Sequence, residues 1–105
     1  MIDQNLVKNK VENLQISICV PLYNEAESIP ELNTWIATVM NKHNFTYEVI
    51  FVDDGSIDKT VEIVKDISTK NRNIKFLSLS RNFGHQAALK AGIDYANGDC
   101  VIVRV

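Results

Sequence analysis

The 105-residue sequence has only two cysteines, two prolines and four glycines, and it has no long hydrophobic run. No apolar stretch approaches the ~18 residues of a membrane span, and residues 1–15 lack the apolar centre of a secretory signal. Acidic and basic residues are mixed and give a net charge of -2, so a nucleic-acid-binding stripe is also missing. These absences predict a cytoplasmic protein with a flexible N-terminal tail at residues 1–15 and no nucleic-acid partner.

The two cysteines, Cys19 and Cys100, each lie in an apolar, strand-like stretch. Free cysteine packs as a small hydrophobic residue, and disulfides are rare in the cytosol. Neither cysteine has a second ligand at Cys-x-x-Cys spacing. We therefore expect two buried, reduced thiols rather than a disulfide or a metal site.

The sequence does contain a regular alternation of apolar strands and amphipathic helices. Strands are predicted at Ile16–Val20, Tyr47–Val52, Ile74–Leu79 and Cys100–Val105. Helices are predicted to begin at Ser28, near Asp58 and near Gly84. The spacing of Ser28 and Glu31 is that of a capping box, and the third helix should end before Asn97 and Gly98. Alternation of this kind predicts one α/β domain over residues 16–105 with parallel strands.

The stretch from Val49 to Ser56 is the most informative part of the chain. Four apolar residues run directly into Asp53, Asp54, a glycine and a serine. The apolar run predicts a strand buried on both faces, and two carboxylates at its end are costly to desolvate unless something hydrogen-bonds them. Ligands of open α/β sheets bind at the carboxyl ends of strands. The stretch therefore predicts a ligand site. The alternative is that Asp53-Asp54-Gly55-Ser56 is only a turn that precedes a helix.

Polar residues follow the first and third predicted strands as well. After the first strand, Tyr23 offers a ring on which a nucleobase can stack, and Glu25 offers an acceptor. After the third, Arg81 suits a phosphate or a base edge, and the helix start at Gly84 and His85 favours anions. An aromatic ring, acids and an arginine at one edge of a sheet indicate a nucleotide site.

Other kinds of site fit less well. The Gly-x-Gly-x-x-Gly fingerprint and the Walker lysine loop are both absent. Ser56 has no triad partners in view, because the only histidines are His43 and His85. We expect His85 to be a helix-start residue rather than a catalytic base, and Trp35 to pack beside the apolar stripe of the first helix.

At three motifs the chain resembles glycosyltransferase family 2, which has the GT-A fold, over about Ile16 to Val103. The motifs are Val20-Pro21-Leu22-Tyr23-Asn24-Glu25, Val52-Asp53-Asp54-Gly55-Ser56-Ile57-Asp58 and Ser80-Arg81-Asn82-Phe83-Gly84-His85-Gln86-Ala87-Ala88-Leu89. The last is similar to the branch that contains dolichol-phosphate mannose synthases and undecaprenyl-phosphate glycosyltransferases. The resemblance implies a three-layer α/β/α, Rossmann-like half-domain with a parallel sheet of strand order 3-2-1-4.

The resemblance also implies an activity, the transfer of a sugar from a UDP- or GDP-sugar to an acceptor such as a lipid phosphate. Full-length relatives often work at the cytoplasmic face of a membrane. By the same resemblance, Asp53 would hydrogen-bond the base, Asp54 would face the ribose or brace its loop, and Arg81 would contact the base or the diphosphate. The implied nucleotide-sugar-binding residues are Pro21, Tyr23, Asn24, Glu25, Asp53, Asp54, Ser56 and Arg81.

The sequence departs from the family pattern at its end. In the family the fourth strand leads into an Asp-x-Asp motif that binds a divalent Mg or Mn ion on the diphosphate, whereas Val105 falls about where the first aspartate would be. Asp99 precedes the strand and cannot substitute. We therefore expect a domain truncated before this motif. Such a chain would hold no metal ion and no catalytic residue, and it would transfer little or no sugar alone.

Two other hypotheses stay open. The chain could be a non-catalytic nucleotide-binding or regulatory module that uses the same edge of the sheet. It could also be an α/β fragment that self-associates, because an uncovered apolar strand at residues 100–105 invites pairing with another chain. Nucleotide binding would separate the truncated glycosyltransferase and the nucleotide-binding module from the self-associating fragment.

Overall fold

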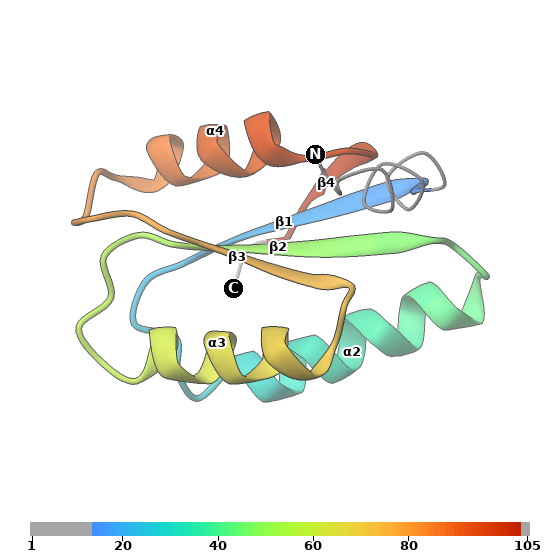
Figure 1. Cartoon of the computed structure of the whole chain (residues 1–105), viewed down its shortest axis with the longest axis horizontal. Coiled ribbons are helices and arrows are strands. Elements are labelled where there is room, and N and C mark those ends of the chain that lie inside the picture. Colours follow the sequence, from blue (N-terminus) through green and yellow to red (C-terminus); the bar gives the residue numbers. More distant parts are fainter. Residues whose placement is uncertain (1–13, 104–105) are drawn as a thin grey trace, which may run out of the picture.

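The computed structural model describes residues 14–103, and Figure 1 labels its helices and strands. The elements are β1 (Ile16–Leu22), α2 (Ile29–Lys42), β2 (Tyr47–Asp53), α3 (Thr60–Lys70), β3 (Ile74–Ser78), α4 (His85–Tyr95) and β4 (Asp99–Ile102). The predicted alternation of strands and helices is confirmed. Most of the predicted tail lies outside the described residues, while Gln15 donates its N–H to the Thr46 carbonyl at 3.1 Å.

The four strands form one parallel sheet of order β3-β2-β1-β4, as the resemblance implies. The two central strands pair from Ile16 opposite Tyr47 to Leu22 opposite Asp53. Every residue of β2 is buried, which explains its nearly continuous apolar sequence. Because β1 and β2 are neighbours, the loops that follow them begin side by side.

Helices cover both faces of the sheet, with α2 and α3 on one face and α4 on the other (Figure 1). Large side chains such as Phe51 and Ile36 fill the core on the α2 and α3 side. The α4 side is tighter, because a Cβ atom added at Gly92 would lie 3.2 Å from the Val52 side chain. The buried Ala88 and Gly92 thus let α4 lie close to the sheet, and the three-layer fold is confirmed.

The capping box predicted at the start of α2 is not formed, and the N-cap residue of α3 is Lys59 rather than Asp58, at which the sequence predicts a cap. Ser28 does precede α2, but its side chain makes no capping hydrogen bond, so the predicted capping box is wrong. Pro30 lies in the first turn of α2, where its missing N–H leaves one fewer donor to satisfy. Asp58 accepts the Thr60 N–H at 2.9 Å at the start of α3. The hydrogen bond from the Thr60 hydroxyl is the main cause that holds the pKa of Asp58 below its ordinary value.

The fourth strand is exposed, as expected for an uncovered edge strand, although its apolar run alone is typical of a buried one. All four residues of β4 are exposed, with Val101 and Ile102 exposed by 45% and 42%. The strand lies at the edge of the sheet, where no other described strand pairs with its outer side. An apolar run reads the same in an edge strand as in a central one, so the sequence could not make this distinction.

Two predictions of buried or packed side chains, at Cys100 and at Trp35, are wrong. Cys100 is exposed because it belongs to the edge strand, whereas Cys19 in β1 is buried as expected. Burial and the neighbouring Cys100 thiol raise the pKa of Cys19 to about 12. Trp35 is 56% exposed instead of packed, since it lies beside the buried face of α2 rather than on it.

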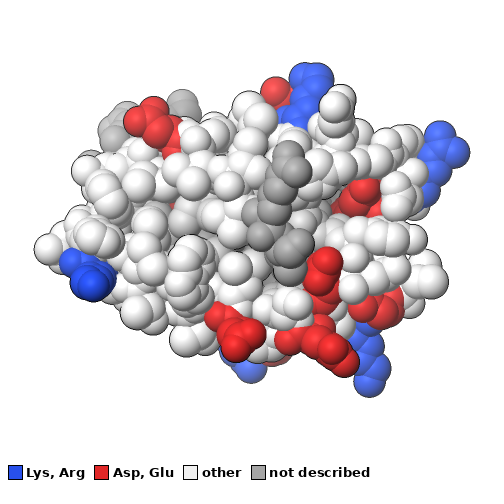
Figure 2. All heavy atoms as spheres, turned by 180° about the vertical axis from the view of Figure 1, so that it is seen from behind, with Lys and Arg blue, Asp and Glu red and all other residues white. Residues whose placement is uncertain are grey.

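Among the described residues, no helix combines the length and the apolar character needed to cross a membrane. Figure 2 shows the rear face of the molecule. There the Lys and Arg side chains of the described residues lie apart from one another around the periphery, with acidic side chains among them.

Candidate functional site

Three loops meet at the carboxyl edge of the sheet. We call them the first loop (residues 23–28), the second loop (54–59) and the third loop (79–84), after β1, β2 and β3 respectively. Each contains one residue with positive φ: Asn24 at 54°, Gly55 at 80° and Gly84 at 103°. Asparagine and glycine adopt this conformation most readily. Each strand can therefore turn sharply toward its helix within a few residues.

An open cavity of about 440 Å³ lies between the first and third loops. Its lining residues are Pro21, Leu22, Tyr23, Glu25, Asp54, Asn82, Gly84 and His85. Half of the site residues expected from the sequence line it: Pro21, Tyr23, Glu25 and Asp54. The other half lie outside the lining: Asn24, Asp53, Ser56 and Arg81.

Asn24 and Ser56 tie the first loop to the second. The N–H of Asn24 donates to Ser56 Oγ at 2.8 Å, and the Asn24 side-chain oxygen accepts the N–H of Ile57 at 2.9 Å. The N–H of Glu25 donates to Thr60 Oγ1 at 2.9 Å. These bonds fix where Tyr23 and Glu25 stand at the cavity, so Asn24 and Ser56 act on the site through the loops they join.

The two adjacent carboxylates are buried, and both have backbone partners. Asp53 is 1% exposed and accepts the N–H of Ser56 at 3.1 Å. Asp54 is 5% exposed and accepts the N–H of Phe83 at 2.9 Å, which ties the second loop to the third. These bonds offset the cost of burying the two carboxylates away from water, which the sequence led us to expect. Asp54 therefore both braces the third loop and lines the cavity.

The second and third loops also touch through their backbones at Gly55. A Cβ atom added at Gly55 would lie 2.4 Å from the backbone nitrogen of Asn82 and 2.5 Å from the carbonyl carbon of Arg81. No side chain fits at this contact. The second loop is thus held against both neighbours, and the cavity has a fixed frame.

Arg81 is directed elsewhere. Its guanidinium carbon lies 4.8 Å from the centre of the Phe83 ring, a cation–π contact on the exposed surface. The sequence predicted a suitable side chain at the right edge of the sheet. It could not predict that a neighbouring aromatic ring would hold that side chain outside the cavity lining.

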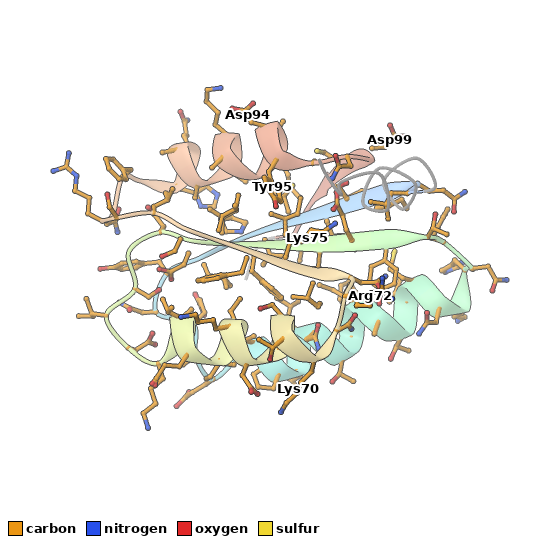
Figure 3. The ribbon with its side chains drawn as sticks, in the orientation of Figure 1. Lys70, Arg72, Lys75, Asp94, Tyr95 and Asp99 are labelled. Atoms are coloured by element: carbon orange, nitrogen blue, oxygen red, sulfur yellow. The ribbon has the colours of Figure 1, made fainter. Side chains whose placement is uncertain are left out.

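Sequence reasoning missed a buried carboxylate at the opposite edge of the sheet. Glu48 in β2 accepts hydrogen bonds from Ser17 Oγ at 2.6 Å and from the Asn97 N–H at 2.9 Å, and it forms an ion pair with Lys75. Burial alone would raise the pKa of Glu48, but hydrogen bonds from Lys75, Ser17 and the Asn97 N–H hold it below its ordinary value. The only signal in the sequence is one acid inside an otherwise apolar strand. Figure 3 labels Lys75 on β3 at this edge.

The cavity offers groups that suit a nucleotide. The Tyr23 ring is 45% exposed, and the carboxylates of Glu25 and Asp54 can accept hydrogen bonds from hydroxyl or N–H groups. At the start of α4, the N–H groups of His85 and Gln86 have no acceptor within the described part of the chain. Such a helix start attracts anions.

The described residues do not fit a divalent metal ion. Within residues 14–103, no three side chains of His, Cys, Asp or Glu come together as a metal-binding group.

Comparison with known proteins places these features in one family. The family described as glycosyl transferase family 2 matches residues 17–104. An uncharacterized glycosyltransferase of Synechocystis sp. is 46% identical over 89 residues, which cover 85% of this chain and 28% of the relative. The undecaprenyl-phosphate 4-deoxy-4-formamido-L-arabinose transferase of Pseudomonas fluorescens is 39% identical over 88 residues, which cover 83% of this chain and 26% of that protein.

A solved structure is similar over the same region. The mannosyltransferase PcManGT from Pyrobaculum calidifontis, in complex with GDP-Man and Mn2+, superposes with a TM-score of 0.74 at 25% identity. The match covers 86% of this chain and 27% of that one. The chain therefore spans little more than a quarter of the length of the relatives it matches.

Proposed function

This chain belongs to glycosyl transferase family 2, and we propose that it binds the nucleoside diphosphate part of a sugar donor in the cavity at the carboxyl edge of its sheet. One observation carries the proposal: Tyr23, Glu25 and Asp54, from two loops far apart in sequence, line the same cavity. A stacking ring beside two acceptors suits a base and a ribose. The donor is a UDP- or GDP-sugar, and titration of UDP and of GDP distinguishes the two bases.

We assign the expected site residues two kinds of role. Tyr23 stacks on the base, while Glu25 and Asp54 accept from base N–H groups or ribose hydroxyls. Pro21 stiffens the wall beside them. Asn24, Asp53 and Ser56 hold the loops in place through the hydrogen bonds described above. Arg81 reaches the base or the diphosphate only if its guanidinium leaves the Phe83 ring.

For the whole protein we propose sugar transfer to a lipid phosphate at the cytoplasmic face of a membrane. The support is the relative named as an undecaprenyl-phosphate transferase, which is 39% identical. We also propose that the whole protein uses a divalent metal ion, since the similar mannosyltransferase was solved with Mn2+ and GDP-Man. Within residues 14–103, no three His, Cys, Asp or Glu side chains come together as ligands for that ion.

Replacing Tyr23 with alanine should weaken nucleotide binding about tenfold or more, because stacking of one base on an aromatic ring contributes about 1–3 kcal/mol. The loss follows from the removal of the ring that lines the cavity. Calorimetric titration of UDP and of GDP into the wild-type chain and into Tyr23→Ala measures it.

Tyr95→Ala is the matched control for this experiment. Tyr95 is similarly exposed, at 48%, but it lies at the far end of α4 (Figure 3) and should leave affinity unchanged. Wild-type protein that binds neither UDP nor GDP would exclude the proposed function. Equal losses in the two variants would contradict the placement of the base at Tyr23.

The open edge of β4 favours a second proposal, that two copies of this chain pair through it. Val101 and Ile102 are exposed, and no other strand of residues 14–103 pairs with the outer side of β4. Light scattering should show a mean mass that rises above the monomer value with concentration, and Val101→Lys should suppress the rise. A monomer at every concentration tested would contradict the pairing.

A further inference from the structure

The lining of the cavity contains two acidic residues and one histidine, and its other residues are uncharged. Glu25 and Asp54 contribute carboxylates, and His85 is the one lining residue whose side chain can carry a positive charge. A diphosphate placed against carboxylates alone would be repelled, and the repulsion is stronger where water is partly excluded. Among the lining side chains, Glu25 and Asp54 can therefore accept hydrogen bonds, and His85 can supply a cationic donor to a phosphate.

The other cationic side chain expected at the site, that of Arg81, is engaged elsewhere. The guanidinium of Arg81 lies against the Phe83 ring, and Arg81 is not among the lining residues. His85 follows Gly84, whose φ of 103° turns the third loop into α4. The N–H of Gly84 donates to the Asn82 side chain at 2.9 Å, which holds this turn in place. His85 is thus set at the cavity wall by local geometry.

We infer that His85 contacts the diphosphate of the donor, so that the nucleotide lies with its base at Tyr23 and its phosphates toward the start of α4. This inference rests on the proposed function and adds an orientation and a named phosphate contact to it. The imidazole donates an N–H to a phosphate oxygen, and a charged imidazole makes that hydrogen bond stronger. No bond is formed or broken in this contact.

The test compares ligands that differ only in the diphosphate. UDP and uridine, and GDP and guanosine, are titrated into the wild-type chain and its variants by two-dimensional NMR, which measures weak binding. His85→Ala should weaken binding of the nucleoside diphosphate about tenfold, the size expected for a hydrogen bond to a charged group. Binding of the nucleoside should change less than about twofold on the same grounds. His85→Lys should restore most of the loss, because it returns a cationic donor.

The second histidine of the chain supplies the control. His43 lies at the C-terminal end of α2, away from the cavity, and His43→Ala should leave both affinities unchanged. Urea unfolding of each variant shows that the fold is kept.

The outcomes distinguish failure of the His85 contact from failure of the proposed function. If the wild type binds UDP or GDP but His85→Ala weakens nucleoside and diphosphate equally, or weakens neither, the diphosphate contact is wrong while the proposed function stands. If the wild type binds neither nucleotide, the proposed function fails and this inference fails with it. A selective loss for the diphosphate, restored by lysine, supports both.

Discussion

Replacing Gly55 with alanine is expected to lower the free energy of unfolding by about 2–4 kcal/mol and to abolish nucleotide binding. Two costs add at this position. The backbone has a φ of 80°, which alanine adopts only with strain, and the new methyl group would meet the backbone of Asn82 at 2.4 Å. Neither loop can yield without losing the contacts that frame the cavity. Urea unfolding and a UDP or GDP titration of the same samples measure the two effects.

Gly84→Ala is the matched control. Its φ is 103°, but a Cβ atom added there meets nothing within 4 Å. The strain of positive φ remains and the clash is removed, so we expect a loss of about 1 kcal/mol. Equal losses in the two variants would mean that the contact between the second and third loops is unimportant.

Replacing Glu48 with alanine is expected to lower the free energy of unfolding by about 2–3 kcal/mol. Breaking a buried ion pair costs about 3–5 kcal/mol when the remaining charge cannot reach water. The Lys75 side chain is 30% exposed and can turn outward, which reduces the cost. The hydroxyl of Ser17 and the N–H of Asn97 lose an acceptor in addition. Thermal and urea unfolding measure the loss.

The same carboxylate should make stability depend on pH. The pKa of Glu48 is lower in the folded chain than its ordinary value of 4.5. Its contribution is therefore fully present above pH 4.5 and is lost as the pH falls through the folded pKa. The difference in unfolding free energy between wild type and Glu48→Gln should shrink as the pH is lowered from 7 toward 3.

Glu62→Gln, at an exposed position in the first turn of α3, is the control for this measurement. It should show no comparable pH-dependent difference from the wild type. A difference between wild type and Glu48→Gln that stays constant over the whole range would mean that the pKa of Glu48 is the same in the folded and the unfolded chain.

The sequence predicts the frame of this protein better than its side-chain contacts. The run from Val49 to Asp54 predicted a buried strand that ends at the edge of the sheet where the cavity lies, because apolar pattern and strand direction are local properties. The edge position of Cys100 and the stacking of Arg81 on Phe83 depend on what lies beside them in space. The local sequence pattern therefore does not predict these contacts.

Glu48 is a second example of contacts that the local sequence pattern cannot predict. Its partners Ser17 and Lys75 are 31 and 27 residues away along the chain, on neighbouring strands. Nothing in the residues around Glu48 names these partners. Only the strand order brings them to one point, and the strand order came from the family resemblance rather than from the residues themselves.

The frame of the cavity and its lining are made by largely different residues. Gly55, Asn24 and Ser56 lock the loops together from outside the lining, whereas Tyr23 and His85 face the open space and make no described loop-locking bond. If the proposed function holds, Tyr23 and His85 are therefore the positions at which donor choice can be changed with little change in stability. A library that randomises the locking residues would instead mostly yield chains that no longer hold a preformed pocket.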